Sequence, residues 1–108
     1  MIEDNKEINS IVKGIEEKKG QNIRVIDLRG IEERICDYLV ICDGGSPTQV
    51  AAIADSVEDI ARKECDLKPQ FVDGLHNALW VVMDYHDIIV HVFVPEMREF
   101  YGLEEIWG

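Results

Sequence analysis

The sequence predicts an α/β (α+β) fold in which helices pack against one mixed sheet of five strands. Three observations support this prediction: stretches with apolar residues at helical spacing, five short runs rich in β-branched and aromatic residues, and their order, α-β-β-α-β-β-β-α. The chain has 108 residues, enough to bury about two-thirds of the unfolded surface in one core. We therefore expect a single domain over residues 1–108.

The chain begins with a predicted helix and two predicted strands. The helix carries a narrow apolar stripe made of Ile8, Ile11, Val12 and Ile15. Gly20 is placed to end this helix. Strands are expected over residues 23–28 and 36–42, and the second strand would put Cys36 and Cys42 on the same face.

A second helix is expected to begin at Ser46 and to continue to about Glu64. Ser46 and Gln49 have the spacing of a capping box, and Pro47 falls at the first helical position. Its inward side is expected to hold Val50, Ile53, Ala54, Val57, Ile60 and Ala61.

The next segments read as three strands. Residues 69–74 predict a short strand or turn, and residues 79–85 and 88–94 predict a hairpin around His86-Asp87. The last strand is apolar apart from His91, so we expect both of its faces to be covered.

The end of the chain predicts short helical structure. Pro95 has no N–H to donate to a ladder and suits the first position of a helix. Met97, Phe100 and Tyr101 follow at helical spacing, and Gly102 is placed to end the turn. Further helical spacing is seen in Leu103, Ile106 and Trp107.

The charge balance favours a basic protein partner over nucleic acid. The chain has 22 acidic and 11 basic residues, a formal net charge of −11. Nucleic-acid binding draws most of its affinity from basic side chains on phosphates, and here no basic run exceeds two residues. The alternative is that the acidic residues only keep the protein soluble, and the net charge by itself does not distinguish the two.

Composition also indicates the compartment. No apolar stretch approaches the ~20 residues of a membrane span, and the first residues lack a signal-peptide pattern. The three cysteines, Cys36, Cys42 and Cys65, have no CxxC spacing. We therefore expect a cytoplasmic protein without membrane contact.

The turn Gly44-Gly45-Ser46 is a candidate phosphate site, because backbone amides at a helix start bind anions. Nucleotidyltransferases use a similar Gly-Ser turn together with paired carboxylates that hold two Mg²⁺. Here the next acidic residue of the helix is Asp55, and a Walker lysine is missing. The capping role of Ser46 explains the turn without a ligand.

Asp84, His86, Asp87 and His91 are the candidate metal or acid–base set. The alternative is that His86 and Asp87 form a polar hairpin turn, and that His91 is an inward or half-buried histidine with a satisfied hydrogen bond. Three convergent ligands are not evident. With neither this set nor a Cys–His pair, we expect no metal, no cofactor and no enzymatic activity.

The last candidate is a recognition surface. Trp80 follows a glycine turn at the start of a strand, where it is either a core residue or an interface anchor. We expect Arg98 on the outward side of the last helix, so that Arg98→Glu would barely change stability. The full set of candidate partner-binding residues is Leu75, His76, Asn77, Trp80, Pro95, Glu96, Arg98 and Tyr101.

One block carries a resemblance to a known family. Residues 90–107 read V-H-V-F-x-P-E-x-R-x-F-Y-x-L-E-x-x-W, and this pattern closely resembles the C-terminal signature of the Iojap family, the ribosomal silencing factors. The resemblance extends to residues 37–42 and 54–58. The family turn is usually Gly-Asp where this chain has His86-Asp87.

The resemblance implies a nucleotidyltransferase-like fold without catalytic residues. It also implies a translation repressor that binds ribosomal protein fourteen of the large ribosomal subunit and sterically blocks subunit association. The region from the glycine turn through the Pro-Glu helix would contribute to docking. The alternatives are a nucleotide-binding or nucleotidyltransferase-like enzyme and a module that forms a homodimer.

Overall fold

A computed structural model describes residues 5–107 and confirms the predicted order of elements. The single C-terminal helical segment is divided in two at Gly102, whose φ of 57° is left-handed. The elements are α1 (Lys6–Glu17), β1 (Gln21–Asp27), β2 (Tyr38–Asp43), α2 (Pro47–Cys65), β3 (Phe71–Asp73), β4 (Trp80–Asp84), β5 (Ile88–Phe93), α3 (Pro95–Tyr101) and α4 (Leu103–Trp107).

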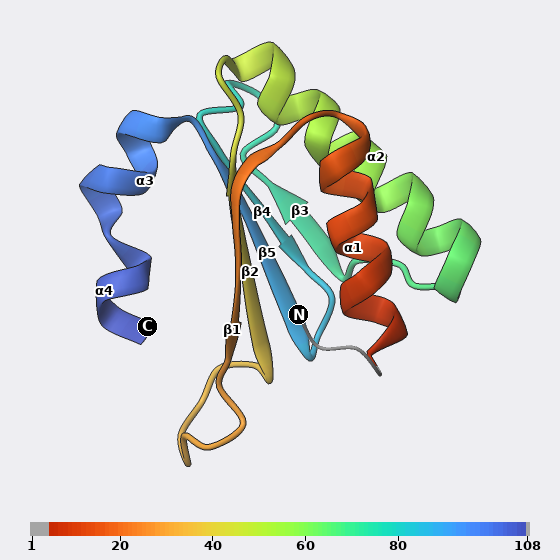
Figure 1. The fold of residues 1–108 in the computed structure, drawn as a ribbon, viewed down its shortest axis with the longest axis vertical. Coiled ribbons are helices and arrows are strands. Elements are labelled where there is room, and N and C mark those ends of the chain that lie inside the picture. Colours follow the sequence, from red (N-terminus) through yellow and green to blue (C-terminus); the bar gives the residue numbers. More distant parts are fainter. Residues whose placement is uncertain (1–4, 108) are drawn as a thin grey trace.

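The five strands form one mixed sheet in the order β1-β2-β5-β4-β3. The central pair, β2 and β5, is parallel, and the other neighbours are antiparallel. Helices α1 and α2 cover one face of the sheet, and α3 and α4 lie on the other (Figure 1). The predicted fold class is therefore confirmed.

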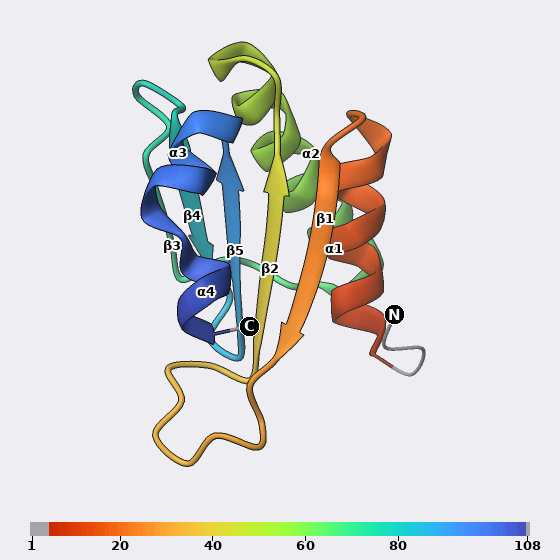
Figure 2. The same ribbon diagram turned by 60° about the vertical axis from the view of Figure 1, so that its left-hand side comes forward.

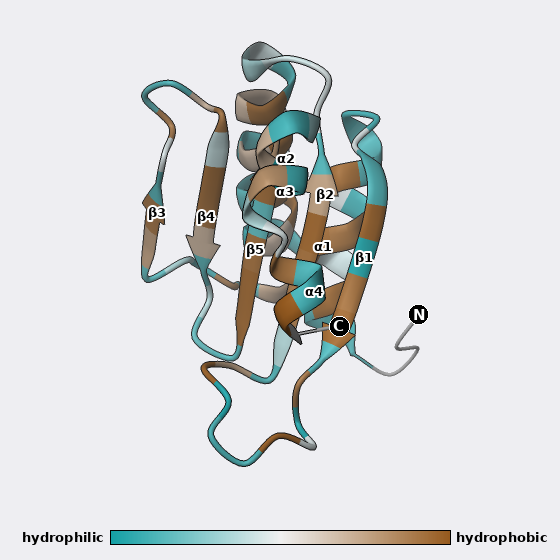
Figure 3. Ribbon diagram, turned by 90° about the vertical axis from the view of Figure 1, so that its left-hand side faces the viewer, coloured by the Kyte–Doolittle hydropathy of each residue, from teal (hydrophilic) through white to brown (hydrophobic). Residues whose placement is uncertain are grey.

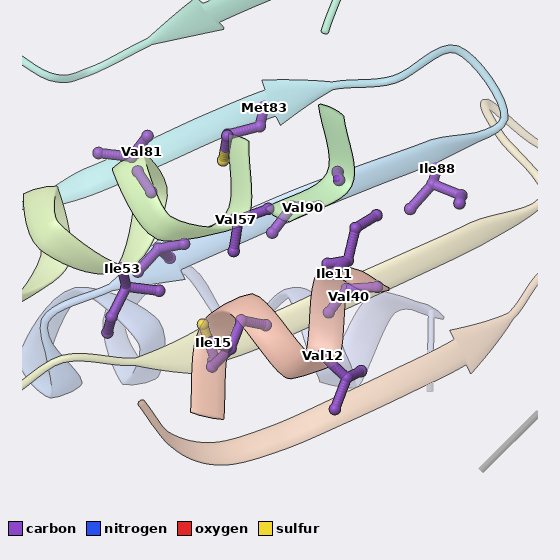
Figure 4. Packing of buried hydrophobic residues seen from close by; sticks show 14 of the residues in the cluster. Ile11, Val12, Ile15, Val40, Ile53, Val57, Val81, Met83, Ile88 and Val90 are labelled. Carbon is purple, nitrogen blue, oxygen red and sulfur yellow. The ribbon is translucent and has the colours of Figure 1, made fainter. Parts of the chain in front are cut away.

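The main core lies between the sheet and the α1–α2 pair. Alternate residues of β2, β4 and β5 point toward these helices, as the side chains of Val40, Val81 and Val90 do in Figure 4. The two helices come close at Gly14, where a Cβ would lie 2.7 Å from the Cα of Val57. The Ser56 hydroxyl donates to the Gly14 carbonyl at 2.8 Å in the same place.

A smaller core lies on the opposite face of the sheet. Its buried members are Ile26, Leu28, Cys36, Leu39, Ile41 and Phe93. Met97 and Leu103 pack against it from the C-terminal helices, which lie across the sheet in Figures 2 and 3. Both faces of β5 are thus covered, as its nearly continuous apolar run predicted.

The prediction that Cys36 and Cys42 share one face of a strand is wrong. Cys36 precedes β2 and belongs to the smaller core, whereas Cys42 lies in the main core on the other side. The amides of Asp37 and Tyr38 both donate to the Asp87 carbonyl, at 2.8 and 3.0 Å. Two successive residues on one acceptor break the alternation, so strand geometry starts only at Tyr38.

Candidate recognition surface

Four aromatic rings run from the smaller core to the surface, and we call them the aromatic row: Phe93, Trp80, Tyr101 and Phe100. Trp80 stacks on Phe93 with the ring centroids 5.1 Å apart, and Tyr101 lies 4.5 Å from Trp80. Phe100 meets Tyr101 edge-on at 5.2 Å. Exposure rises along the row, from 0% at Phe93 to 43% at Tyr101 and 79% at Phe100.

The aromatic row follows from strand register and from the position of Pro95. Trp80 and Phe93 are directly paired across β4 and β5, so their side chains lie on the same face. Pro95 starts α3 immediately after β5, and the last turn of α3 brings Tyr101 over Trp80. A bond from the Val94 amide to the Leu79 carbonyl, 3.0 Å long, holds the start of α3 against β4.

Trp80 is neither fully core nor freely exposed. Its ring is half-buried, and its indole N–H donates to Nδ1 of His91 at 3.0 Å. His91 is 8% exposed, and burial lowers its pKa from 6.5 to about 4. Of the two expected positions for His91, inward or half-buried, the inward one with a satisfied hydrogen bond is confirmed. Because Nδ1 must keep its lone pair to accept this bond, His91 is neutral when Trp80 is in place.

This arrangement predicts an acid-sensitive contribution to stability. Below its ordinary pKa of 6.5, His91 takes up a proton in the unfolded chain but not in the folded one, down to about pH 4. As the pH falls from 6.5 to 4, the free energy of unfolding should therefore decrease by roughly 2–3 kcal/mol from His91 alone. Above pH 6.5, the titration of His91 should hardly affect stability. Urea unfolding of wild type and His91→Gln at several pH values measures it.

His91→Gln is the matched comparison, because glutamine offers an oxygen to the indole N–H but does not titrate. Carboxylates lose their own contributions at low pH in both proteins, so the difference between the two pH profiles isolates His91. Parallel profiles between pH 7 and pH 4 would contradict the prediction.

The β3–β4 loop lies at the same end of the sheet as the start of α3 (Figures 1 and 2). Leu75, His76 and Asn77 are exposed on this loop, and Pro95 and Glu96 are exposed at the start of α3. The structure thus brings these predicted residues to one end of the molecule, near the aromatic row. Their part in partner binding stays a prediction.

Two exposed apolar residues of this region were missing from the predicted set, Phe100 and Leu79. Phe100 follows Met97 at i+3, which reads as one apolar helix face. Helix α3 has only seven residues; Met97 packs against the smaller core, whereas Phe100 is 79% exposed. The sequence spacing alone thus gives no signal of this exposure, and an exposed phenylalanine of this kind is typical of an interaction surface.

The expectation that Arg98 points outward is wrong. Its side chain is 13% exposed and forms ion pairs with Asp43 at 2.9 Å and with Glu104 at 2.7 Å. It also donates to the Asn22 carbonyl at 2.7 Å. The guanidinium has several fixed donors and finds acceptors beneath the helix, so charge alone did not decide its direction. Arg98→Glu would set like charges together and is expected to destabilise the fold.

Asn22 and Arg24 complete a polar cluster that we call the Arg98 network, made of Asn22, Arg24, Asp43, Arg98 and Glu104. The Asn22 amide donates to the second carboxylate oxygen of Asp43 at 2.9 Å. Arg24 pairs with Glu104 at 3.1 Å. The network joins β1 and β2 to α3 and α4, and the partners of Glu104 hold its pKa below the ordinary value.

The backbone amides of Gly44 and Gly45 in the candidate phosphate turn already have partners within the protein. The Gly44 N–H donates to the Phe93 carbonyl at 2.8 Å, and the Gly45 N–H donates to Oε1 of Gln49 at 2.6 Å. The Ser46 hydroxyl accepts from the Gln49 amide at 3.2 Å, as predicted for a cap. The second arm of the predicted capping box is different, because the Gln49 side chain reaches Gly45 and not Ser46.

The carboxyl end of the parallel strand β2 carries an ion pair within the protein. Ligands of open α/β sheets bind outside the carboxyl ends of parallel strands. Here Asp43 ends β2 beside the end of β5, and Arg98 forms an ion pair with it across that position. These contacts argue against a nucleotide at the turn.

The cap itself gives a prediction. Ser46→Ala should lower the free energy of unfolding by about 1 kcal/mol, because the Gln49 amide loses its acceptor. Chemical denaturation measures it, with Thr48→Ala as the comparison at an exposed position in the same helical turn. Equal losses in both variants would contradict a capping role.

The proposed metal set does not converge. His86 lies in the predicted polar turn with a φ of 83°, and its amide donates to Asp84 at 2.8 Å. The Nδ1 atom of His91 accepts the hydrogen bond from Trp80. Among residues 5–107, no group of three or more His, Cys, Asp or Glu side chains is arranged to hold a metal ion. Burial also raises the pKa of Cys42 to about 12, so its thiol stays protonated at neutral pH.

Comparison with known proteins places this chain and its fold in a family. Residues 2–108 match the family described as Ribosomal silencing factor during starvation. The chain is 38% identical over 93 residues to Ribosomal silencing factor RsfS of Bacillus subtilis, covering 86% of this chain and 77% of that protein. It is 33% identical to the chloroplastic protein Iojap of Zea mays, covering 92% of this chain and 42% of that protein.

A solved structure agrees. The crystal structure of a protein from Chromobacterium violaceum superposes with a TM-score of 0.88 at 28% identity, covering 94% of this chain and 83% of that one. The fold is a small α/β domain with exposed aromatic rings on its C-terminal helices. The chain belongs to the ribosomal silencing factor (Iojap) family. No helix within residues 5–107 is long and apolar enough to cross a membrane.

Proposed function

We propose that this protein represses translation by occupying the large ribosomal subunit. It binds ribosomal protein fourteen on the face that meets the small subunit, and its bulk keeps the two subunits apart. The observation that carries the proposal is the aromatic row, which leaves Phe100 and Tyr101 exposed on a member of the silencing factor family. Exposed aromatic side chains are the type that dominates interface energetics.

The proposed action is steric and needs no chemistry. The turn at Gly44 has internal partners for its amides, and Asp43 is paired with Arg98. These contacts favour a binding protein over the nucleotidyltransferase-like alternative. A thermal-shift series with ATP, CTP and Mg²⁺ separates the two, because a ligand at a hundred times its dissociation constant stabilises by about 2.7 kcal/mol. We expect the melting temperature to stay unchanged.

The negative charge of the chain is complementary to a basic protein partner in the cytoplasm. A net charge of −11 attracts basic surfaces and repels the phosphates of ribosomal RNA. The proposed contact is therefore with protein, with little or no direct nucleic-acid contact and no membrane. Two copies of this chain would repel one another at long range, which disfavours the homodimer at low salt.

Charge attraction predicts a salt-dependent association rate. Rising salt from low to physiological concentration should slow association with ribosomal protein fourteen and leave dissociation nearly unchanged, because long-range attraction is screened beyond ~8–10 Å. Stopped-flow measurements give both rates. A flat association rate would count against electrostatic steering, though not against the contact.

Sucrose-gradient sedimentation of purified ribosomal subunits tests the proposal. With the protein present, we expect fewer joined ribosomes, more free subunits, and the protein in the large-subunit fraction. Addition of the protein after the subunits have joined is the control, since a steric blocker acts before joining. An unchanged joined fraction at saturating protein would overturn the proposed function.

A further inference from the structure

The C-terminal helices form an arm with little buried surface of its own. Helix α3 has no buried residue, and Met97 and Leu103 are only partly buried against the smaller core. Yet this arm carries Phe100 and Tyr101, the most exposed rings of the aromatic row. Something besides apolar packing must fix its position if these rings are to be presented in one place.

Arg98 has the geometry to do so. From the middle of α3 its side chain reaches three different elements: the Asn22 carbonyl on β1, Asp43 at the end of β2 and Glu104 on α4, all at 2.7–2.9 Å. Bonds in three directions from a rigid planar group restrict both translation and rotation of the arm. A lysine at this position would keep the positive charge but not the planar group with donors in several fixed directions.

The surroundings of Arg98 strengthen the restriction. The Asp43 side chain is 8% exposed and takes its second bond from Asn22. A carboxylate this buried is costly to leave unpaired. Movement of the arm away from the sheet would either expose the Asp43 carboxylate to water or leave it buried without its ion pair. Arg24 holds Glu104 from the far side, so α4 is tied to β1 as well.

We propose that Arg98 is a positioning residue for docking. It fixes the arm against the sheet so that Phe100 and Tyr101 are presented in their binding arrangement, and it does not itself touch the partner. A surface that is ordered before binding loses less freedom on binding, which raises affinity. The docking consequence rests on the proposed function, whereas the ordering of the arm does not.

Hydrogen exchange of the free protein tests the ordering. In Arg98→Lys, the amides of residues 96–107 should exchange about tenfold faster or more, as expected for loss of charged hydrogen bonds, while α1, α2 and the central strands keep their protection. Asp43→Asn removes the charge of the other partner in the Arg98–Asp43 ion pair and should give the same faster exchange confined to the arm. Arg62→Lys is the matched control, because Arg62 forms an exposed ion pair with Asp59.

A double-mutant cycle with Phe100→Ala tests the docking consequence. Arg98→Lys should weaken binding to the large subunit about tenfold in the wild-type background and much less in the Phe100→Ala background. Additive losses would mean that Arg98 contacts the partner directly, which overturns the positioning role. Unchanged exchange in residues 96–107, or faster exchange everywhere, would also overturn it. Localised exchange with no ribosome binding by wild type would uphold the ordering role and reject the proposed function.

Discussion

Gly74→Ala is expected to lower the free energy of unfolding by roughly 3–4 kcal/mol. Gly74 has a φ of +92°, and an added Cβ would lie 2.0 Å from the Trp80 carbonyl oxygen. The backbone must shift at the point where the Ala78 amide bonds to the Gly74 carbonyl, at 2.9 Å. For a domain of this size each kcal/mol moves the melting temperature by about 4–8 °C, so the loss is readily measured by thermal and urea unfolding.

Gly30→Ala is the matched control, because a Cβ at Gly30 meets nothing within 4 Å. Its unfolding free energy should stay within about 0.5 kcal/mol of wild type. The position of Gly74 also makes its variant informative for function, since the loop from Gly74 to Trp80 carries Leu75 and its exposed neighbours. A Gly74→Ala protein as stable as the control would show that the loop relaxes without strain.

The parts of the fold that the sequence predicts well are those with local causes. Helix α2 begins at Ser46 because the hydroxyl, the proline and the apolar stripe all lie within a few residues. The buried faces of β5 follow from an apolar run that only His91 interrupts. The left-handed end of α3 at Gly102 follows from the residue type alone.

The parts that could not be predicted depend on residues distant in the chain. Arg98 turns inward because Asn22 and Asp43, more than fifty positions away, offer acceptors beneath α3. Phe100 is 79% exposed because the last turn of α3 contacts the sheet through Tyr101, which lies over Trp80. Cys36 changes sides because the Asp87 carbonyl accepts from two successive amides. Tertiary contacts set each of these outcomes.

Trp80 shows why the candidate site needed the structure. The sequence left it as either a core residue or an interface anchor, and the structure gives it features of both. Its stacking on Phe93 and its bond to His91 mean that Trp80→Ala should cost stability as well as docking. A loss of binding in that variant would therefore not identify the interface. The outer rings of the aromatic row separate the two effects.

Phe100→Ala is expected to weaken binding to the large subunit by at least about thirtyfold, or about 2 kcal/mol, while leaving stability nearly unchanged. Phe100 is 79% exposed in the free protein, so truncation removes little folded-state packing. Burial of the same ring against a partner would remove a large apolar area from water, which is the source of the expected affinity. Co-sedimentation with purified large subunits and a melting curve measure the two effects.

Phe71→Ala is the control for a nonspecific apolar contribution. Phe71 is 52% exposed on the edge strand β3 and pairs with Asp84, at the opposite end of β4 from Trp80. It should bind like wild type, whereas Tyr101→Ala should resemble Phe100→Ala because its ring lies between Phe100 and Trp80. If Phe100→Ala and Tyr101→Ala both bind the large subunit as tightly as Phe71→Ala, the aromatic row is not the docking surface.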